Sequence, residues 1–216
     1  MINPRDTMKR LLFCIAALLA SAAMLTAQTP EEIINRMETE MEKSDQLGMA
    51  VTMDIKIPIL GKTSARMNVR GQKSRTDMSL SDVKTSIWMD ETTTWTWTTT
   101  PTENEVVIES RKDSSSSNED NLDLAKGICK GYDVTLSKET ADAWYFNCKK
   151  SKDNTEKDDP KTMTLVVDKG TYLMKELSAK VKGITVTMRD SKLGVSEGDV
   201  TFDISKCPGA KVTDKR

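Results

Sequence analysis

The sequence contains no histidine, and only 5% of its 216 residues are aromatic. Without histidine, neither a Ser-His-Asp nor a Cys-His catalytic centre can form, and the most common side-chain ligand of transition metals is missing. The charges almost cancel, with 32 Lys and Arg against 33 Asp and Glu, so the chain offers no basic surface for nucleic acid. We therefore expect no metal site, no cofactor and no nucleic-acid partner. Chemistry by a carboxylate or a thiol, or no chemistry at all, remains open, and we expect a protein that is not an enzyme.

Long hydrophobic runs are scarce as well. An apolar run from Leu11 to Leu19 follows a cationic segment and precedes small residues that end at Ala27. This order is typical of a secretory signal peptide, although cleavage after Ala23 is an alternative. A retained membrane anchor is another alternative, but the run is shorter than the roughly 20 residues that a span needs. We expect residues 1–27 to be the signal peptide and residues 28–216 to be a single domain.

Few cysteines remain once the signal peptide is removed, namely Cys129, Cys148 and Cys207. No CxxC motif is present, which disfavours a redox-active thiol. Two β-rich segments flank a polar turn at 137–140, and pairing them about this turn sets Cys129 opposite Cys148. In an oxidising compartment these two cysteines could form a disulfide. A bridge to Cys207 is the alternative.

The mature chain begins with a helix signal. Thr29 can cap a helix, Pro30 suits its first position, and Glu32 completes a capping box. Apolar residues then recur at helical spacing among polar ones. The pattern predicts an amphipathic helix over residues 30–43, with one apolar side formed by Ile33, Ile34, Met37 and Met41.

From Gly48 onward the apolar residues alternate with polar ones, which is typical of half-buried strands. Short polar turns separate these segments and favour antiparallel pairing, because parallel pairs need long crossovers. One interruption, at 118–126, resembles a short capped helix in mid-chain. The predicted strands cover residues 49–57, 65–70, 76–80, 85–90, 93–99, 105–110, 132–136, 143–149, 162–168, 173–182, 184–189 and 200–204.

Such a sheet has more apolar surface than two short helices can cover, so we expect an incomplete antiparallel barrel with the helices as a lid and room for an apolar ligand. Many methionines in the strands suit a variable apolar partner, although they also fill irregular cores. The tryptophans either pack within the sheet or line the wall of the ligand cavity. The predicted cavity residues, chosen by apolar character, are Met53, Ile55, Met67, Met78, Leu80, Trp88, Trp95, Trp97, Phe146 and Leu165.

The order of these features resembles the outer-membrane lipoprotein carrier family, the LolA-like proteins. The resemblance extends over nearly all of residues 28–216: a capped helix, strands that include the run TSIWMDETTTWTW at 85–97, a mid-chain helix, further strands, and the tail VTFDIS at 200–205 that leads to GAKV at 209–212. It implies a mainly β fold, an incomplete antiparallel barrel with helices as a lid, and a location in the periplasm.

The resemblance also implies a function. Proteins of this family carry the acyl chains of lipoproteins in an apolar cavity toward the outer membrane, as monomers that exchange cargo with an inner-membrane release complex and an outer-membrane receptor. A family arginine contacts the lid, and Arg70 is its nearest match. Gly71 follows it where the family usually has proline. A solvent-facing arginine is the alternative for Arg70.

Two other functional classes remain open from the sequence. A protein of the same architecture could sense stray envelope lipid or lipoprotein and act on a membrane-bound regulator. A secreted hydrolase could use paired carboxylates, such as Asp77 with Asp82 or Glu103 with Glu105, if the fold placed them several ångströms apart across a cleft.

Overall fold

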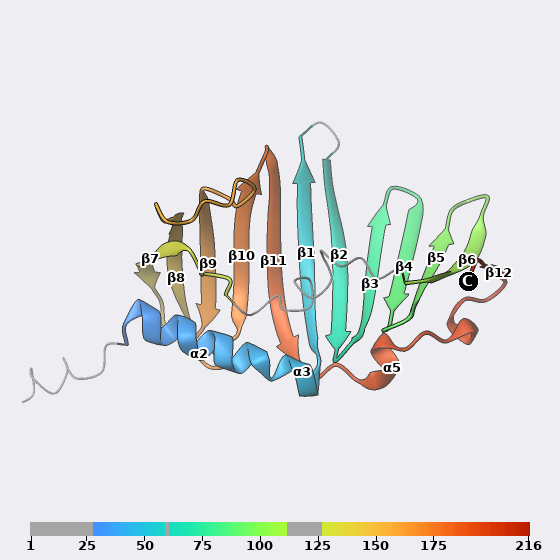
Figure 1. Ribbon diagram of the computed structural model, residues 1–216, viewed down its shortest axis with the longest axis horizontal. Helices are drawn as coiled ribbons and strands as arrows, with labels where there is room; N and C mark the ends of the chain where they lie inside the picture. Colours follow the sequence, from blue (N-terminus) through green and yellow to red (C-terminus); the bar gives the residue numbers. More distant parts are fainter. Residues whose placement is uncertain (1–27, 59–60, 112–126) are drawn as a thin grey trace, which may run out of the picture.

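The computed structural model describes residues 28–58, 61–111 and 127–216. Two helices, α2 (Pro30–Glu42) and α3 (Ser44–Leu47), precede one open sheet of twelve strands (Figure 1). The strands are β1 (Met49–Ile57), β2 (Gly61–Arg70), β3 (Lys73–Leu80), β4 (Val83–Met89), β5 (Thr93–Thr99), β6 (Asn104–Ser110), β7 (Tyr132–Glu139), β8 (Ala143–Lys150), β9 (Thr162–Asp168), β10 (Met174–Val181), β11 (Ile184–Leu193) and β12 (Lys211–Asp214). Two short helical segments, α5 (Glu197–Val200) and η1 (Ile204–Lys206), lie between β11 and β12.

The predicted N-terminal helix is confirmed, and its capping box is formed. The backbone N–H of Thr29 donates to Glu32 Oε2 at 2.8 Å, and the N–H of Glu32 donates to Thr29 Oγ1 at 3.2 Å. These two bonds satisfy donors that the first turn of a helix leaves free. The predicted apolar side of the helix is buried, at Ile33, Ile34, Met37 and Met41.

The strand order is β12-β6-β5-β4-β3-β2-β1-β11-β10-β9-β8-β7, so the first strand lies in the middle of the sheet. Neighbouring strands are antiparallel except β12 and β6, which are parallel. The predicted mainly β fold with an unclosed sheet is therefore confirmed, and the sheet is mixed rather than wholly antiparallel. Alternation along single strands could not reveal the pairing of β1 with β11, because that pairing joins segments more than a hundred residues apart.

The strand predicted at 200–204 is wrong. Ser196 and Asp199 form a capping box that starts α5, and the side chain of Asp203 accepts the N–H of Ser205 to start η1. These local side-chain bonds to the backbone compete with strand pairing and end it here. The predicted mid-chain helix at 118–126 and the signal peptide at 1–27 lie outside the described residues. Within the described residues, no helix has the length and apolar character to cross a membrane.

The helix α2 covers one face of one half of the sheet, and we call this face the inner face. Directly paired residues of neighbouring strands project to the same face, so the register identifies the members of each face. Under α2 lies the main core, which draws on β1 and on β8 to β11. Its buried strand residues include Met49, Val51, Trp144, Phe146, Cys148, Met163, Leu165, Val167, Met174 and Met188.

The other half of the sheet, from β2 to β6, is covered on the opposite, outer face. Here Phe202, from the C-terminal segment, stacks on Trp95 with ring centroids 5.3 Å apart and meets the edge of Trp88 at 5.4 Å. Trp88, Val106 and Cys207 are fully or nearly fully buried in this second cluster. The two halves of the sheet are thus sheltered on opposite faces.

An ionic group on the outer face holds the two halves together at β1. Asp54 is only 8% exposed, and its carboxylate pairs with Arg189 of β11 and with Lys62 of β2, both at 3.0 Å. Ser64 also donates to it. Arg189, followed by Ser64 and Lys62, holds the pKa of Asp54 well below its usual range. The carboxylate is therefore ionised and bonded on both sides of the central strand.

Candidate functional site

Large apolar side chains continue on the inner face beyond the core under α2. We call these residues the apolar strip: Met53, Ile55, Met67, Met78, Leu80, Val83 and Ile87. Leu80 is 59% exposed, Val83 40% and Met78 39%, whereas most core residues are below 9%. Met53 and Met67 also pack against the core, so the strip is continuous with it.

The register places the strip on one face. On β1 and β2, Met53 pairs with Ala65, and Val51 pairs with Met67. Further along the sheet, Ala65 pairs with Met78, and Leu80 pairs with Val83. Because the core residue Val51 belongs to this same set, the strip lies on the face that α2 covers elsewhere.

Five of the ten predicted cavity residues lie in this strip: Met53, Ile55, Met67, Met78 and Leu80. Two others, Phe146 and Leu165, share the inner face but are 1% and 0% exposed in the core under α2. Both side chains are packed within the core and expose no surface to a ligand.

The structure does not bring the three predicted tryptophans together with the strip. Trp88 pairs with Arg75 and with Trp95, and Ser86 pairs with Trp97, all on the outer face. The prediction grouped side chains by apolar character alone, and a shift of one residue along a strand changes the face. Trp88, Trp95 and Trp97 pack against the C-terminal segment instead.

Sequence reasoning missed Val83 and Ile87. Their strand alternates Val83, Thr85, Ile87 and Met89 with Lys84, Ser86 and Trp88. Because Trp88 is the largest apolar residue of the strand, the prediction assigned its set, and not that of Ile87, to the cavity. The inner-face set becomes recognisable only through its pairing with Met78 and Leu80.

Arg70 lies where the ends of several elements meet. Its Nη1 donates to the carbonyl oxygen of Val195 at 2.7 Å and to that of Leu47, the last residue of α3, at 3.2 Å. Its Nε lies 3.7 Å from Glu197 of α5. The guanidinium therefore joins the helical segment α2–α3 to the C-terminal segment, although about a third of the side chain is exposed.

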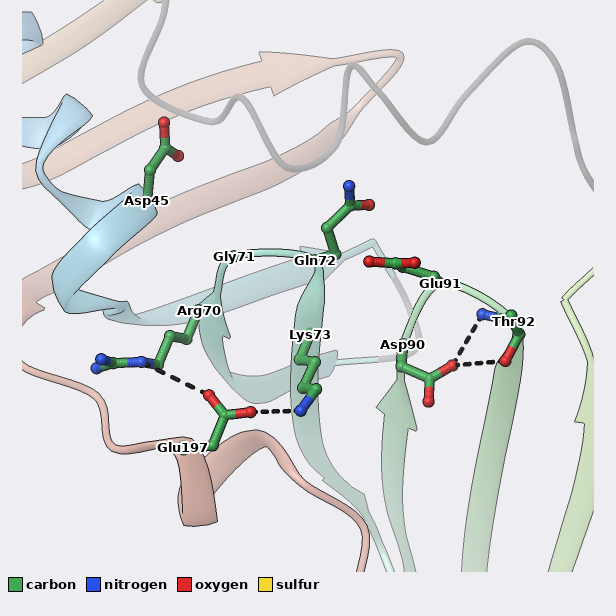
Figure 2. A pocket seen from close by; sticks show the side chains of 9 residues that line it. All are labelled: Asp45, Arg70, Gly71, Gln72, Lys73, Asp90, Glu91, Thr92 and Glu197. Carbon is green, nitrogen blue, oxygen red and sulfur yellow. Dashed lines mark hydrogen bonds and ion pairs between the residues drawn. The ribbon is translucent and has the colours of Figure 1, made fainter.

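A charged hollow of about 450 Å³ lies beside Arg70, and Figure 2 shows the side chains that line it. Glu197 lies between Arg70 and Lys73, and Lys73 lowers the pKa of Glu197. Across the hollow, Asp90 accepts the N–H and hydroxyl of Thr92. Within the described part of the chain, no group of three or more His, Cys, Asp or Glu side chains could hold a metal ion. The ion pairs of Glu197 with Arg70 and Lys73 join α5 to β2 and β3.

The two candidate disulfide cysteines do meet, but the predicted register is wrong: Cys148 pairs with Val134 across β7 and β8, and Cys129 lies in the turn before β7. The Sγ atoms of Cys129 and Cys148 are 3.9 Å apart, and both residues are free thiols, 8% and 1% exposed. The hydrogen bond with Cys148, followed by burial, raises the pKa of Cys129. Cys207 belongs to the other cluster, on the outer face, which separates it from this pair. No disulfide is formed among the described cysteines.

No family model and no curated protein matches the sequence. Among solved structures, the chain is similar to an uncharacterized conserved protein from Thermus thermophilus, with 16% identity and a TM-score of 0.45 over 87% of this chain and 100% of that one. It is similar to a LolA superfamily protein from Nitrosomonas europaea, with 12% identity and a TM-score of 0.33 over 82% and 99%. It is also similar to LprF from Mycobacterium bovis, with 10% identity and a TM-score of 0.48 over 79% and 96%.

The family that the sequence resembles is thus represented among these similar structures. The TM-scores are all below 0.5 and the identities are 16% or less. At this level the likenesses carry no weight for what the chain binds, and the geometry of its own inner face has to support any function.

Proposed function

We propose that this protein is a carrier that binds the acyl chains of a lipoprotein, or of a related lipid, on its inner face. The observation that carries the proposal is the apolar strip, in which Met78, Leu80 and Val83 are 39 to 59% exposed beside a well-packed core. Monomeric soluble proteins rarely expose a contiguous apolar patch without a binding function.

The energetics of the strip suit a fatty chain. Each buried CH₂ group of an acyl chain contributes about 0.8 kcal/mol, so a chain laid along several strip residues gains affinity in small, additive steps. Methionine is unbranched and adapts its shape to different apolar partners. Met53, Met67 and Met78 would then accept chains of different length and curvature.

The remaining features of the proposed role come from the sequence pattern and from the resemblance. The carrier would be a single domain over residues 28–216, exported to the periplasm by a signal peptide at 1–27. It would work as a monomer between an inner-membrane release complex and an outer-membrane receptor. Arg70 would hold α2 and α3 in place over the core and let them move when cargo enters, and Cys129 and Cys148 would form a disulfide in the oxidising compartment.

A binding experiment with a triacylated peptide tests the proposal. We expect the protein to bind this peptide with micromolar or tighter affinity and Leu80→Asp to weaken binding at least tenfold, because the variant places a charge among the apolar side chains of the strip. Ile204→Asp is the matched control, since Ile204 is 49% exposed but lies in η1, outside the strip. Equal affinities for the two variants, or no binding of the peptide by the unmodified protein, would reject the proposal.

A further inference from the structure

The inner face changes its chemistry within the open half of the sheet. On β3 and β4, threonines are interspersed with strip residues at the inner-face positions, and on β5 the inner-face positions are all threonine. The register forms rows across the strands: Thr76 pairs with Ile87, which pairs with Thr96, and Met78 pairs with Thr85, which pairs with Thr98. We call these residues the threonine rows: Thr76, Thr85, Thr94, Thr96 and Thr98.

The hydroxyls of the threonine rows are unused within the described residues. All five side chains are half-buried, and none donates a hydrogen bond to a described residue, whereas Thr63 donates to the Ser79 carbonyl at 3.0 Å and Thr135 donates to the Asn147 carbonyl at 3.3 Å. Five free hydroxyls on three adjacent strands form an array of donors and acceptors directly beside the apolar strip.

The charges around the rows discriminate between headgroups. The rows end on β6, where Thr98 pairs with Glu105 and Thr94 pairs with Glu109. These carboxylates are offset by lysines, Glu105 by Lys211 at 4.0 Å and Glu109 by Lys215 at 3.2 Å. Within the rows themselves the register places no Lys or Arg, so a phosphate or carboxylate laid along them has no cation among the row residues to pair with, and the lysines at the β6 edge are already paired with Glu105 and Glu109.

We propose that the threonine rows bind the neutral, polyhydroxylated headgroup, a glycerol or a sugar, of the lipid whose acyl chain lies on the apolar strip. This inference rests on the proposed function and adds the headgroup class and the orientation of the ligand. The chain lies over β1 to β4, and the headgroup points toward β5 and β6. Hydroxyls of the ligand then exchange hydrogen bonds with Thr96 and Thr98.

Two ligands with the same twelve-carbon acyl chain test the inference: monolauroylglycerol, which is neutral, and laurate, which is anionic, both below their micellar concentrations. We expect the glycerol ester to bind at least fivefold more tightly. The double variant Thr96→Val and Thr98→Val keeps the side-chain shape and removes two hydroxyls, so it should weaken binding of the ester about tenfold and change laurate binding less than threefold. Thr164→Val, at an exposed outer-face position of β9, should change neither.

The outcomes separate the two proposals. If laurate binds as tightly as the ester, or if the double variant weakens both ligands equally, the headgroup inference is overturned while the carrier proposal stands. If neither ligand and no triacylated peptide binds, the carrier proposal fails, and the headgroup inference fails with it. A circular dichroism melt of the double variant distinguishes a lost contact from a lost fold.

Discussion

Both halves of the inner face carry large apolar side chains, but different segments cover the two halves of the sheet. Under α2, Phe146 and Leu165 are 1% and 0% exposed, whereas Leu80 on β3 is 59% exposed. Strands β3 and β4 carry large apolar side chains on this face, as the strands under α2 do, so the difference in exposure between Leu80 and Phe146 does not come from the strand pattern. It comes from what packs on them, because the helix shelters one half and the C-terminal segment turns to the outer face of the other. Among the described residues nothing packs on the inner face of that half, which leaves it available to a ligand.

The largest contrast between the halves should be in stability. Phe146→Ala removes a large side chain from the core under α2 and should lower the free energy of unfolding by about 3–5 kcal/mol. Urea denaturation followed by circular dichroism measures this change. A loss below about 1 kcal/mol would mean that the α2 core is much looser than its burial indicates.

The cysteine pair also belongs to the α2 half. Cys129 and Cys148 are 19 residues apart in the chain, and closing this loop by oxidation should stabilise the protein by about 3 kcal/mol relative to the reduced form. Mass spectrometry after alkylation, with and without a reductant, counts the free thiols, and paired urea curves measure the stability. If both cysteines are alkylated after oxidation with glutathione disulfide, or if the two curves coincide, the prediction is wrong.

The outer-face carboxylate tests how the halves are joined. Asp54→Asn leaves Arg189 and Lys62 without their partner and should cost about 1–2 kcal/mol, since both cations are partly exposed. Because folding lowers the pKa of Asp54, its contribution is complete above the unfolded pKa of about 3.9 and is lost as the pH falls below it. The stability of the unmodified protein should therefore fall between about pH 5 and pH 2 more steeply than that of the variant. Parallel pH profiles would contradict this account.

Arg70 links the helical cover of one half to the tail that covers the other. Arg70→Gln removes its two bonds to backbone carbonyls and should cost about 1 kcal/mol. Hydrogen exchange at the amides of α3 should become faster. If the substitution destabilised only β2, exchange in α3 would not change. Arg66→Gln is the control, because Arg66 is an exposed position on the same strand.

The smallest effect on stability is expected in the apolar strip. Leu80→Ser removes a side chain that is already more than half exposed, so the free energy of unfolding should change by no more than about 0.5 kcal/mol. Binding of a triacylated peptide should nevertheless weaken severalfold. A large loss of stability would indicate that the strip is packed core rather than a binding surface.

Much of the fold could be predicted from local patterns. The bounds 49–57, 93–99 and 162–168 match β1, β5 and β9, and Thr29 with Glu32 begins the helix as expected. Long-range pairing could not be predicted, since the register of β1 with β11 depends on segments far apart in the chain. The face of each strand was also undetermined: Trp88 and Ile87 are neighbours in sequence, yet the first is packed on the outer face and the second belongs to the inner one.

The central claim is that the open half of the inner face binds the ligand while the core under α2 does not. Methyl NMR of methionine-labelled protein tests it within one molecule. Titration with a triacylated peptide should shift the methyl signals of Met53, Met67 and Met78 and leave those of Met37 and Met174, both 0% exposed, nearly unchanged. Shifts confined to the core methionines, or no shift of the strip methionines at saturating peptide, would contradict the claim.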